Sequence, residues 1–312
     1  MLRDCIKSLQ ELTYPSYEII VVDNGSTDGS PEMVRNEFPS AKLVVNPTNL
    51  GFAAACNAGI KVAQGDFIAL FNSDAVAEPF WLSKLVKAIS ENEETGVASG
   101  PIFYYDPPDV LWSVGCRMDA VTGINWRVGW NKRLDEVKET ADFDFFSFCA
   151  VLIKRSVLKE VGLLDEDYFM YSEDVDWTYR AARLGYKCKF DSSAIVWHKS
   201  SFTRRRNPSK GFYYFMRGSF RLYFIHFPIK YLAASIIFQL TFFPFFEVIF
   251  FRTSGLYILQ RFKAFAWNIA NLKSTMARRS RVNLCGNLVL KNRLKEFLET
   301  ANSHRASKSY DF

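Results

Sequence analysis

The sequence predicts an α/β fold, with a doubly wound, mostly parallel sheet followed by a C-terminal helical region that associates with membranes. Three observations support this prediction. Residues 1 to about 100 alternate strand-like and helix-like segments in short units. Beyond about residue 210 the chain is aromatic and basic. The charge divides in the same way, because residues 1–198 carry 19 Lys+Arg against 29 Asp+Glu, whereas residues 199–312 carry 20 against 4.

The first hundred residues predict successive strands and helices, read from apolar spacing and turn residues. Asp23 ends the first strand, a turn rich in Gly and Ser follows, and Pro31 lies where the first turn of a helix accepts proline. Alternating units of this kind favour parallel pairing. In order, the predicted elements are a helix over 2–12, a strand over 18–23, a strand over 42–45, a helix over 52–63 and a strand over 67–71.

The strand over 67–71 ends on the tripeptide Asn72-Ser73-Asp74. A buried strand that carries a carboxylate at its carboxyl end is how open α/β sheets build ligand sites. Mg²⁺ and Mn²⁺ bind through one or two carboxylates together with substrate phosphates, so Asp74 is the first metal candidate. The alternative is that the tripeptide is an ordinary turn.

The pattern loosens over 105–140, where prolines, glycines and three tryptophans indicate a long connection with small strands, placed to cover a site. The tryptophans are Trp112, Trp126 and Trp130. A strand-like run over 143–154 restores order.

Residues 171–180 predict the start of a helix. Ser172 is its expected cap, and Glu173 and Asp174 lie in the first turn, where the helix dipole favours acidic side chains. A purely structural, capping role for these two carboxylates is therefore one alternative.

Taken in order, these motifs resemble family 2 of the inverting glycosyltransferases, over roughly residues 1 to 225, and look most like its rhamnosyltransferase-like enzymes of surface-polysaccharide assembly. The resemblance implies a GT-A type, Rossmann-like nucleotide-sugar domain over 1–210 and a membrane-associated helical region over 211–312. The matching segments are VVDNGSTDG at 21–29, NLGFA at 49–53 with the asparagine at 57, GD at 65–66, NSD at 72–74, CAVLIKR at 149–155 with VG at 161–162, EDVD at 173–176 and WH at 197–198.

By this resemblance, Asp23 would hydrogen-bond the nucleotide base, and Asp74 would hold a Mg²⁺ or Mn²⁺ ion that bridges the diphosphate. Asn72 occupies the first position of the family's metal-binding triplet, and its amide removes one charge there, so that Asp74 alone would anchor the ion. The nucleotide-sugar-binding residues implied in this way are Asp23, Asn24, Gly25, Ser26, Asn49, Gly51, Asn57, Asn72 and Ser73.

The resemblance also implies catalytic roles. Asp174 would be the general base that takes the proton from an acceptor hydroxyl, and Glu173 would orient or secure the helix. In related enzymes a histidine at the position of His198 reaches the metal or the diphosphate; the alternative is a strand-end histidine satisfied by its neighbours. The arginines at 204–206 are either a diphosphate clamp or a solvated or lipid-facing basic run.

The match breaks at the start of the sequence. The family's chain usually opens with a strand and a Thr-Tyr-Asn-like turn against the nucleotide, whereas this sequence opens on Leu2 to Ile6 in what resembles the following helix. In a doubly wound sheet the first strand is central, so its neighbours are expected to be left unpaired. A start codon assigned too far downstream, a truncated and impaired product, and another segment that fills the gap are the three explanations.

The tail is expected to meet a membrane. The apolar run over 231–251 has transmembrane length, but Pro244 interrupts it and Gln239 and Glu247 lie within it. We therefore expect helices in the inner leaflet, against anionic lipid, rather than a span or a buried helical subdomain. No nucleic-acid partner is expected, because Phe far outnumbers what base stacking requires. The expected location is the cytoplasmic face of the cell membrane, peripheral or monotopic.

The sequence leaves three functions open. The first is an enzyme that transfers a sugar, such as rhamnose, from a nucleotide-sugar donor to a glycan or lipid-linked acceptor. The second is a catalytically impaired relative that acts as a membrane scaffold. The third is a nucleotidyltransferase, which needs a Gly-rich, basic loop near the start that the sequence lacks. No secretory signal peptide is visible, and the six scattered cysteines are expected to be reduced thiols.

Overall fold

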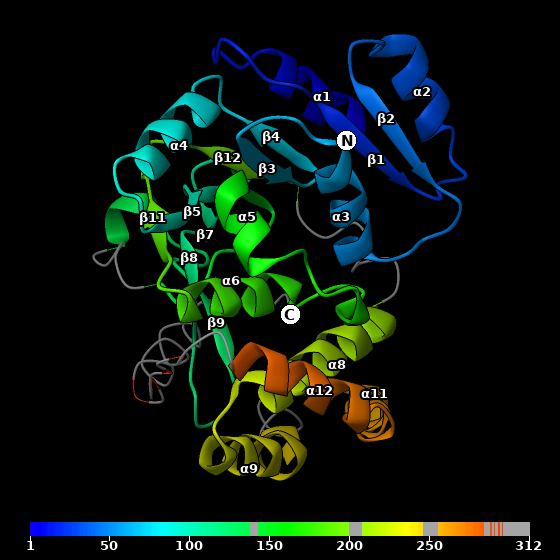
Figure 1. Ribbon diagram of the computed structural model, residues 1–312, viewed down its shortest axis with the longest axis vertical. Coiled ribbons are helices and arrows are strands. Elements are labelled where there is room, and N and C mark those ends of the chain that lie inside the picture. Colours follow the sequence, from blue (N-terminus) through cyan, green and yellow to red (C-terminus); the bar gives the residue numbers. More distant parts are fainter. Residues whose placement is uncertain are drawn as a thin grey trace.

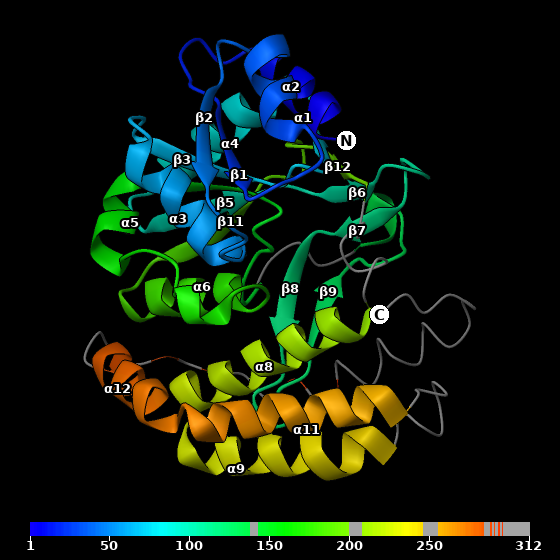
Figure 2. The ribbon, with the colours of Figure 1, turned by 90° about the vertical axis from the view of Figure 1, so that its right-hand side faces the viewer.

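The computed structural model describes residues 1–137, 143–199, 208–245 and 255–283, together with Leu288, Leu290, Arg293 and Lys295. Within these residues, strands and helices of the N-terminal two thirds form a layered α/β body, and the C-terminal helices lie together against one end of it (Figure 1). A quarter turn shows α8, α9 and α11 as a layer beneath the sheets (Figure 2).

The first hundred residues fold as the sequence predicts. The strand that ends on Phe71 has the expected bounds, and Pro31 lies in the first turn of its helix. The elements are α1 Leu2–Gln10, β1 Ile20–Asn24, α2 Ser30–Glu37, β2 Lys42–Asn46, α3 Phe52–Val62, β3 Phe67–Phe71, β4 Ala75–Ala77, α4 Trp81–Ser90 and β5 Thr95–Ser99.

The predicted long connection with small strands is confirmed for the described part of 105–140. The run over 143–154 forms a strand only at its end, because Phe145 makes a single isolated bridge to Cys116 before β10 begins. The remaining elements of the body are β6 Ile102–Tyr104, β7 Leu111–Ser113, β8 Gly115–Met118, β9 Asn125–Val128, η1 Leu134–Glu136, β10 Ala150–Lys154, α5 Arg155–Val161, η2 Glu166–Tyr168, α6 Glu173–Arg183, β11 Lys187–Phe190 and β12 Val196–His198.

The sheets are mixed, so the prediction of a mostly parallel sheet is wrong. Strands β1 and β2, β5 and β11, and β6 and β12 pair in parallel. However, β10 runs antiparallel to both β3 and β5, and β12 runs antiparallel to β4. The sequence pattern fails here because β10 returns to the sheet after the 105–149 connection rather than through a crossover helix, and such a return sets no parallel direction.

Strands β1 and β3 each have one unpaired edge. Within the described residues β1 pairs with β2 alone, and β3 pairs with β10 alone. Val21, Val22 and Leu70 line a cavity that separates the two strands, which confirms the expectation of unpaired neighbours. The cavity is about 3280 Å³ and continues from this gap, past the acidic strand ends, to α8.

The C-terminal helices share a hydrophobic core with the body. Val175 and Tyr179 of α6 pack in one cluster with Phe220 and Leu222 of α8. No described helix is both long enough and apolar enough to cross a membrane, and the expected run over 231–251 extends past the described residues. The helices are α8 Pro208–His226, α9 Ile229–Ile237, the π-helix η3 Phe238–Phe242, α11 Gly255–Ala270 and α12 Leu272–Asn283.

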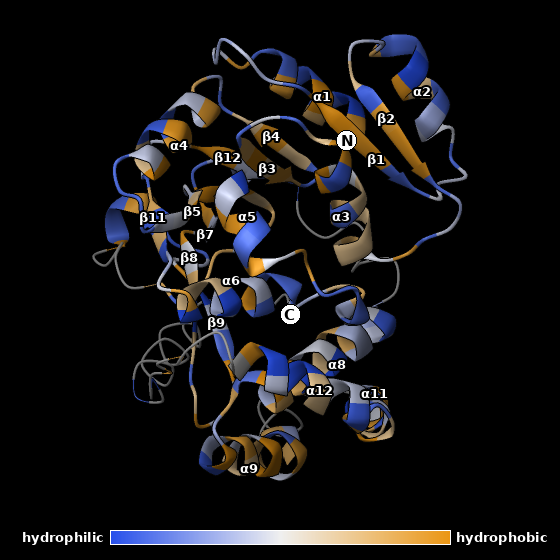
Figure 3. Ribbon diagram, in the orientation of Figure 1, coloured by the Kyte–Doolittle hydropathy of each residue, from blue (hydrophilic) through white to orange (hydrophobic). Residues whose placement is uncertain are grey.

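Hydropathy differs between the layers. In Figure 3, α9 is coloured hydrophobic over most of its length. Ile229, Ile237 and Phe242 are exposed by 79, 55 and 65 %, so α9 and η3 present apolar side chains to the surroundings. The five described cysteines are free thiols, as expected, and burial raises the pKa of the Cys5 thiol to about 12.

Candidate functional site

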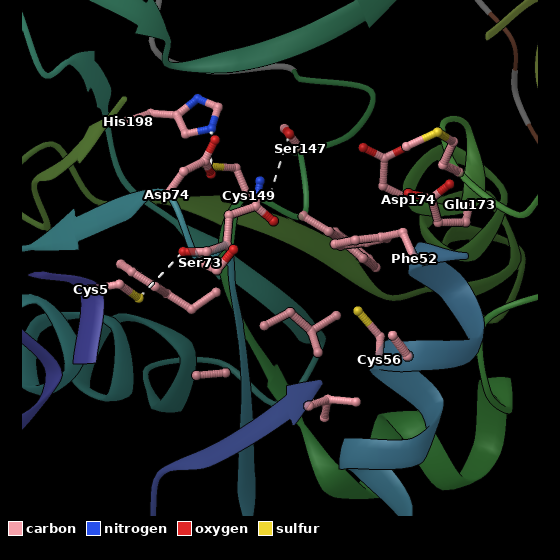
Figure 4. Close-up of a pocket in the computed structure, with 18 of the residues that line it drawn as sticks. Cys5, Phe52, Cys56, Ser73, Asp74, Ser147, Cys149, Glu173, Asp174 and His198 are labelled. Carbon is pink, nitrogen blue, oxygen red and sulfur yellow. Dashed lines mark hydrogen bonds and ion pairs between the residues drawn. The ribbon is translucent and has the colours of Figure 1, made fainter. Parts of the chain in front are cut away.

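The first corner of the cavity, called the metal corner below, consists of Asp74 and His198. Asp74 follows β3, and His198 ends β12, which pairs with β4 so that His198 lies opposite Ala75. This register brings the two side chains together, with Nε2 of His198 3.0 Å from Oδ1 of Asp74 (Figure 4). The structure therefore joins two residues that lie 124 positions apart in the sequence.

The metal corner favours a charged carboxylate. Burial alone would raise the pKa of Asp74, but the hydrogen bond and charge of His198 outweigh it, so the pKa is lowered. Burial would lower the pKa of His198, yet Cys149 and Asp74 raise it overall. Figure 4 shows Cys149 beside this pair. The ring of Trp112 packs edge-on against His198, with the centroids 4.9 Å apart.

The second corner, called the base corner, consists of Glu173 and Asp174 at the start of α6. Both line the same cavity as Asp74, on its other side (Figure 4). Burial raises the pKa of Asp174 to about 6, although the backbone amides of Val175 and Phe148 favour its charged form. The amide of Val175 donates to Asp174 Oδ1 over 2.8 Å. A carboxylate with this pKa accepts a proton near neutral pH more readily than an ordinary aspartate.

Glu173 differs from its neighbour. It is 5 % exposed, and within the described residues its Oε2 has no hydrogen-bond partner. Burial and the charge of Asp174 raise its pKa well above the ordinary value. The prediction that Ser172 caps the helix is wrong, because Ser172 has a left-handed backbone and makes no side-chain cap hydrogen bond.

The third corner holds Asp23 at the carboxyl end of β1. Its Oδ2 accepts hydrogen bonds from the amides of Gly25, at 3.2 Å, and Ser26, at 3.1 Å. Gly25 has a φ of +77°, and a Cβ there would lie 2.7 Å from the backbone of Thr48, so only glycine fits this turn. Asp23 and Ser26 line the cavity, whereas Gly25 shapes the turn behind them.

Asn24 acts within the fold rather than as an open ligand. Its amide group donates to Asn49 Oδ1 and to the carbonyl of Gly51, and its Oδ1 accepts from Asn46 and from the amide of Leu50. All its usual hydrogen-bonding positions are thus used in holding the loop before α3. Asn24 and Asn49 still border the cavity.

Gly51 and Asn57 connect this loop to the segment before the base corner. A Cβ on Gly51 would lie 2.4 Å from the carbonyl oxygen of Phe169. Asn57 is 1 % exposed. Its Nδ2 donates to the carbonyl of Leu164 and to the carboxylate of Glu166, and its Oδ1 accepts from the amide of Leu164. Neither residue lines the cavity, so direct contact with a donor stays a prediction that this arrangement does not favour.

Asn72 and Ser73 lie on the cavity beside Asp74. The backbone of Asn72 is anchored on both sides, because its amide donates to the carbonyl of Cys149 over 2.8 Å and its carbonyl accepts from Ala75 over 3.1 Å. Ser73 is exposed. The arginines at 204–206, predicted as a possible clamp, lie outside the described residues.

Arg127 is a further cavity residue that was not among those predicted from the sequence. Its guanidinium lies between two aromatic rings, 4.5 Å from the centroid of Trp112 and 4.8 Å from that of Trp130. The Nε1 of Trp130 donates to the hydroxyl of Tyr104 over 2.7 Å, which fixes the ring of Trp130. All these side chains line the cavity. The tryptophans in the 105–140 connection were the available signal, but nothing in the pattern indicated that they enclose a cation.

The donor atoms at the metal corner fit a divalent ion that arrives with a substrate. Asp74 offers a carboxylate, and His198 offers an imidazole nitrogen once the ion displaces the proton that the raised pKa of His198 retains. This combination suits Mn²⁺ better than Mg²⁺, which prefers oxygen ligands. Within the described residues no group of three or more His, Cys, Asp or Glu side chains is placed to hold an ion. An ion here would complete its coordination with phosphate oxygens and water.

Three aspartates line one cavity: Asp74 after a strand, Asp23 within a turn, and the buried Asp174. Together they define the site of a transferase that uses nucleotide-linked substrates. Residues 1–162, more than half of the chain, match the family model described as Glycosyl transferase family 2. The chain therefore belongs to glycosyl transferase family 2, whose members transfer sugars from nucleotide-sugar donors.

Curated relatives include a rhamnosyltransferase. The chain is 28 % identical over 229 residues to the N-acetylglucosaminyl-diphospho-decaprenol L-rhamnosyltransferase of Mycobacterium tuberculosis, covering 65 % of this chain and 73 % of that protein. It is 27 % identical over 202 residues to glycosyltransferase AglE of Haloferax volcanii, covering 63 % of this chain and 62 % of that protein. These similarities confirm the rhamnosyltransferase-like resemblance.

Solved structures share the fold. The mannosyltransferase PcManGT from Pyrobaculum calidifontis, in complex with GDP-Man and Mn²⁺, aligns at a TM-score of 0.52 and 16 % identity, covering 99 % of this chain and 84 % of that one. GalNAc-T7 with UDP, GalNAc and Mn²⁺ aligns at a TM-score of 0.58 and 16 % identity, covering 97 % and 54 %. At these identities the likeness establishes the GT-A-like fold, with its mixed sheets.

Proposed function

We propose that this protein transfers a sugar, with inversion at the anomeric carbon, from a nucleotide-sugar donor to a hydroxyl group of an acceptor. One observation carries the proposal: the metal corner and the base corner open on one cavity from different sides, and their aspartates have opposite pKa shifts. A leaving group held at one side and a base at the other is the arrangement that a single displacement needs.

In the proposed step, the acceptor oxygen forms a bond to the anomeric carbon while the bond to the diphosphate oxygen breaks. The acceptor proton passes to Asp174, whose raised pKa suits it to that role. The diphosphate leaves toward Asp74 and His198. A divalent ion bound there, for which the donor set favours Mn²⁺, would supply Lewis-acid stabilisation of the negative charge on the leaving group.

Arg127 is the proposed cationic partner of the diphosphate within the described residues. It lies one tryptophan ring away from His198, because Trp112 contacts both. Trp112 and Trp130 line the cavity, and their rings suit the apolar faces of sugar rings, since aromatic rings provide large contact areas at low entropic cost. We therefore place the transferred sugar and the acceptor terminus near this stack.

The relatives guide the choice of substrates. The mycobacterial relative is named for an L-rhamnosyl donor group and a diphospho-decaprenol acceptor. We propose that a nucleotide-linked rhamnose or a related sugar is the donor, and that a glycan or lipid-linked saccharide is the acceptor.

We further propose that the C-terminal helices bind the cytoplasmic face of the cell membrane as a peripheral or monotopic surface. The charge of +16 over residues 199–312 and the exposed apolar side chains of α9 and η3 support a surface containing anionic lipid. Flotation with vesicles of phosphatidylglycerol and of phosphatidylcholine tests this. If high salt fully reverses binding to the anionic vesicles, charge alone holds the protein to them. If the floating fraction contains as much protein without vesicles as with either lipid, the proposal is refuted.

The enzymatic proposal is tested by screening nucleotide sugars for thermal stabilisation with and without Mn²⁺, then assaying transfer with the donors that stabilise. We expect a rise in Tm that needs both the nucleotide sugar and the metal, and a β-linked product from an α-linked donor or the reverse. A product that keeps the donor's anomeric configuration would rule out inversion, and a Tm insensitive to every nucleotide sugar would contradict the donor assignment.

A further inference from the structure

The four residues before the base corner adopt an unusual backbone. Phe169, Tyr171 and Ser172 have φ values of +64°, +68° and +71°, in the left-handed region that side chains other than glycine's rarely enter. Three such residues in a four-residue loop persist only where the surroundings enforce them, and strain of this kind concentrates at functional sites. The loop leads directly into Glu173 and Asp174, so its conformation sets where α6 begins.

Helix α8 contacts both this loop and the two residues directly before it. Nη2 of Arg217 donates to the carbonyls of Asp167 and Tyr168, both at 2.9 Å. The ring of Tyr214 stacks on Phe169, with the centroids 4.6 Å apart. Arg217 is itself fixed between two rings, 5.0 Å from Tyr214 and 4.4 Å from Trp267 of α11.

The approach of helix to loop is closest at Gly218. A Cβ there would lie 2.5 Å from the carbonyl oxygen of Tyr171 and 3.1 Å from Oγ of Ser172, so any larger residue must push the loop away. The far end of α8 is tied to the same catalytic helix, because Nε2 of His226 lies 2.9 Å from Oδ1 of the fully buried Asp176. Asp176 also binds Arg180 on α6 over 2.9 Å.

The other side of the loop is held by the donor half of the cavity. The amide of Phe52, which begins α3, donates to the carbonyl of Phe169. Figure 4 shows the side chain of Phe52 beside Asp174 and Glu173. The loop therefore lies between α3 and α8 and contacts both. Helix α8 belongs to the C-terminal region, so that region contacts the loop that precedes the general base.

Given the proposed function, we infer that α8 is a positioning element for the general base. Gly218 packs against the Phe169–Ser172 loop and Arg217 holds the two residues directly before it, so that Asp174 faces the acceptor. The C-terminal helices then belong to the catalytic machinery in addition to any role at a membrane. Gly218 and Arg217 touch neither Asp74 nor the turn of Asp23 in the described contacts, so their loss affects the base and leaves the metal corner intact.

The test uses the full chain with Gly218→Ala, and Gly255→Ala as its control, because a Cβ on Gly255 of α11 meets no other described residue within 4 Å. Gly218→Ala is expected to lower kcat by at least about tenfold, while the affinity for UDP, GDP or dTDP with Mn²⁺ stays within about twofold, the tolerance the assay requires to separate positioning from binding. Hydrogen exchange is expected to accelerate in residues 167–176 and not in β10. The control should change none of these quantities.

A second pair of variants covers the case in which Gly218→Ala fails to fold. Arg217→Met removes both hydrogen bonds to the carbonyls of Asp167 and Tyr168, whereas Arg217→Lys keeps the charge and one donor direction. We expect kcat to fall in the order wild type, Arg217→Lys, Arg217→Met, at constant nucleotide affinity. A folded Gly218→Ala or Arg217→Met with unchanged kcat, or with nucleotide affinity lost in parallel, overturns the inference. Absence of sugar transfer by the wild type would instead refute the proposed function. Hydrogen exchange in the loop would still show whether α8 holds it.

Discussion

The metal corner and the base corner use the same side chain in opposite surroundings. Asp74 lies beside His198, whose hydrogen bond and charge lower its pKa despite burial. The hydrogen bonds that favour the charged form of Asp174 come from the backbone amides of Val175 and Phe148, and burial outweighs them and raises its pKa to about 6. The first aspartate is built to remain charged and the second to exchange a proton, so the environment rather than the residue type decides the role.

The largest expected effect is that of Asp174→Asn, which should affect the base corner and leave the metal corner intact. The amide keeps the size of the side chain but cannot accept the acceptor's proton, so kcat should fall by about 10²- to 10⁴-fold. Mn²⁺-dependent binding of nucleoside diphosphate should survive, as measured by calorimetry on the same preparation. Equal loss of turnover and of nucleotide binding would show that Asp174 is not the base.

Asp74→Asn should give the reverse pattern. Loss of the metal-binding carboxylate is expected to weaken Mn²⁺-dependent nucleotide binding by about 10- to 100-fold or more, the scale of effects seen even for residues that only support a metal's ligands. Nucleotide binding measured without metal should change little. If Mn²⁺ enhances binding to the variant as strongly as to the wild type, the metal corner lies elsewhere.

The pH dependence distinguishes the two carboxylates without mutation. Because burial raises the pKa of Asp174 to about 6, the active deprotonated form is lost as pH falls through that value. The kcat should therefore be constant above about pH 7 and fall about tenfold for each unit below pH 6. A rate that holds level down to pH 4, near the ordinary value for aspartate, would contradict the assignment.

His198→Asn probes the chemical character of the metal corner. Replacing the imidazole by an oxygen ligand should reduce the ratio of activity with Mn²⁺ to activity with Mg²⁺ by several-fold, because nitrogen ligands suit Mn²⁺ better. The matched control is Trp112→Phe, which keeps an aromatic ring beside the histidine. An unchanged metal ratio in His198→Asn would mean that His198 does not reach the ion.

The last expected effect is on stability rather than on turnover. An acid whose pKa is raised by folding destabilises the folded state where it is ionised, so Asp174→Asn should be more stable than the wild type above pH 6. The difference should be about 3 kcal/mol at pH 7 and vanish below about pH 3, where the carboxyl is neutral in both states. Urea unfolding at the two pH values measures it. Equal stability at both would mean that Asp174 is not desolvated.

Much of this site could be predicted from local sequence. Asp23, Asp74 and Asp174 each follow or begin a regular element, and such positions can be read from apolar spacing and turn residues. The opposite pKa shifts of Asp74 and Asp174 could not, because they depend on His198 from a distant strand and on burial. The direction of β10 was mispredicted for a similar reason, since strand pairing is a long-range property.

The contacts of the C-terminal region were even harder to predict from local sequence. Its aromatic and basic composition indicated a membrane surface, and that surface stays a prediction. Composition could not show that Gly218 and Arg217 face the loop before Asp174, because this contact depends on the packing of α8 against a strained backbone. Ser172 was predicted to cap α6 for a related reason: residue preference indicates a cap, whereas its left-handed φ was set by tertiary contacts.

The gap between β1 and β3 has a consequence for when, rather than where, the corner that holds Asp23 forms. The strand that carries Asp23 packs in a small core of its own with α1, α2 and β2, built around Ile6, Val34 and Phe38. A unit that lacks ladder hydrogen bonds to the main sheet opens locally at a lower free energy than the sheet itself. The amides of β1 should therefore exchange with solvent before those of β10, and a bound nucleotide should slow them most, so that ligand completes the folding of its own site.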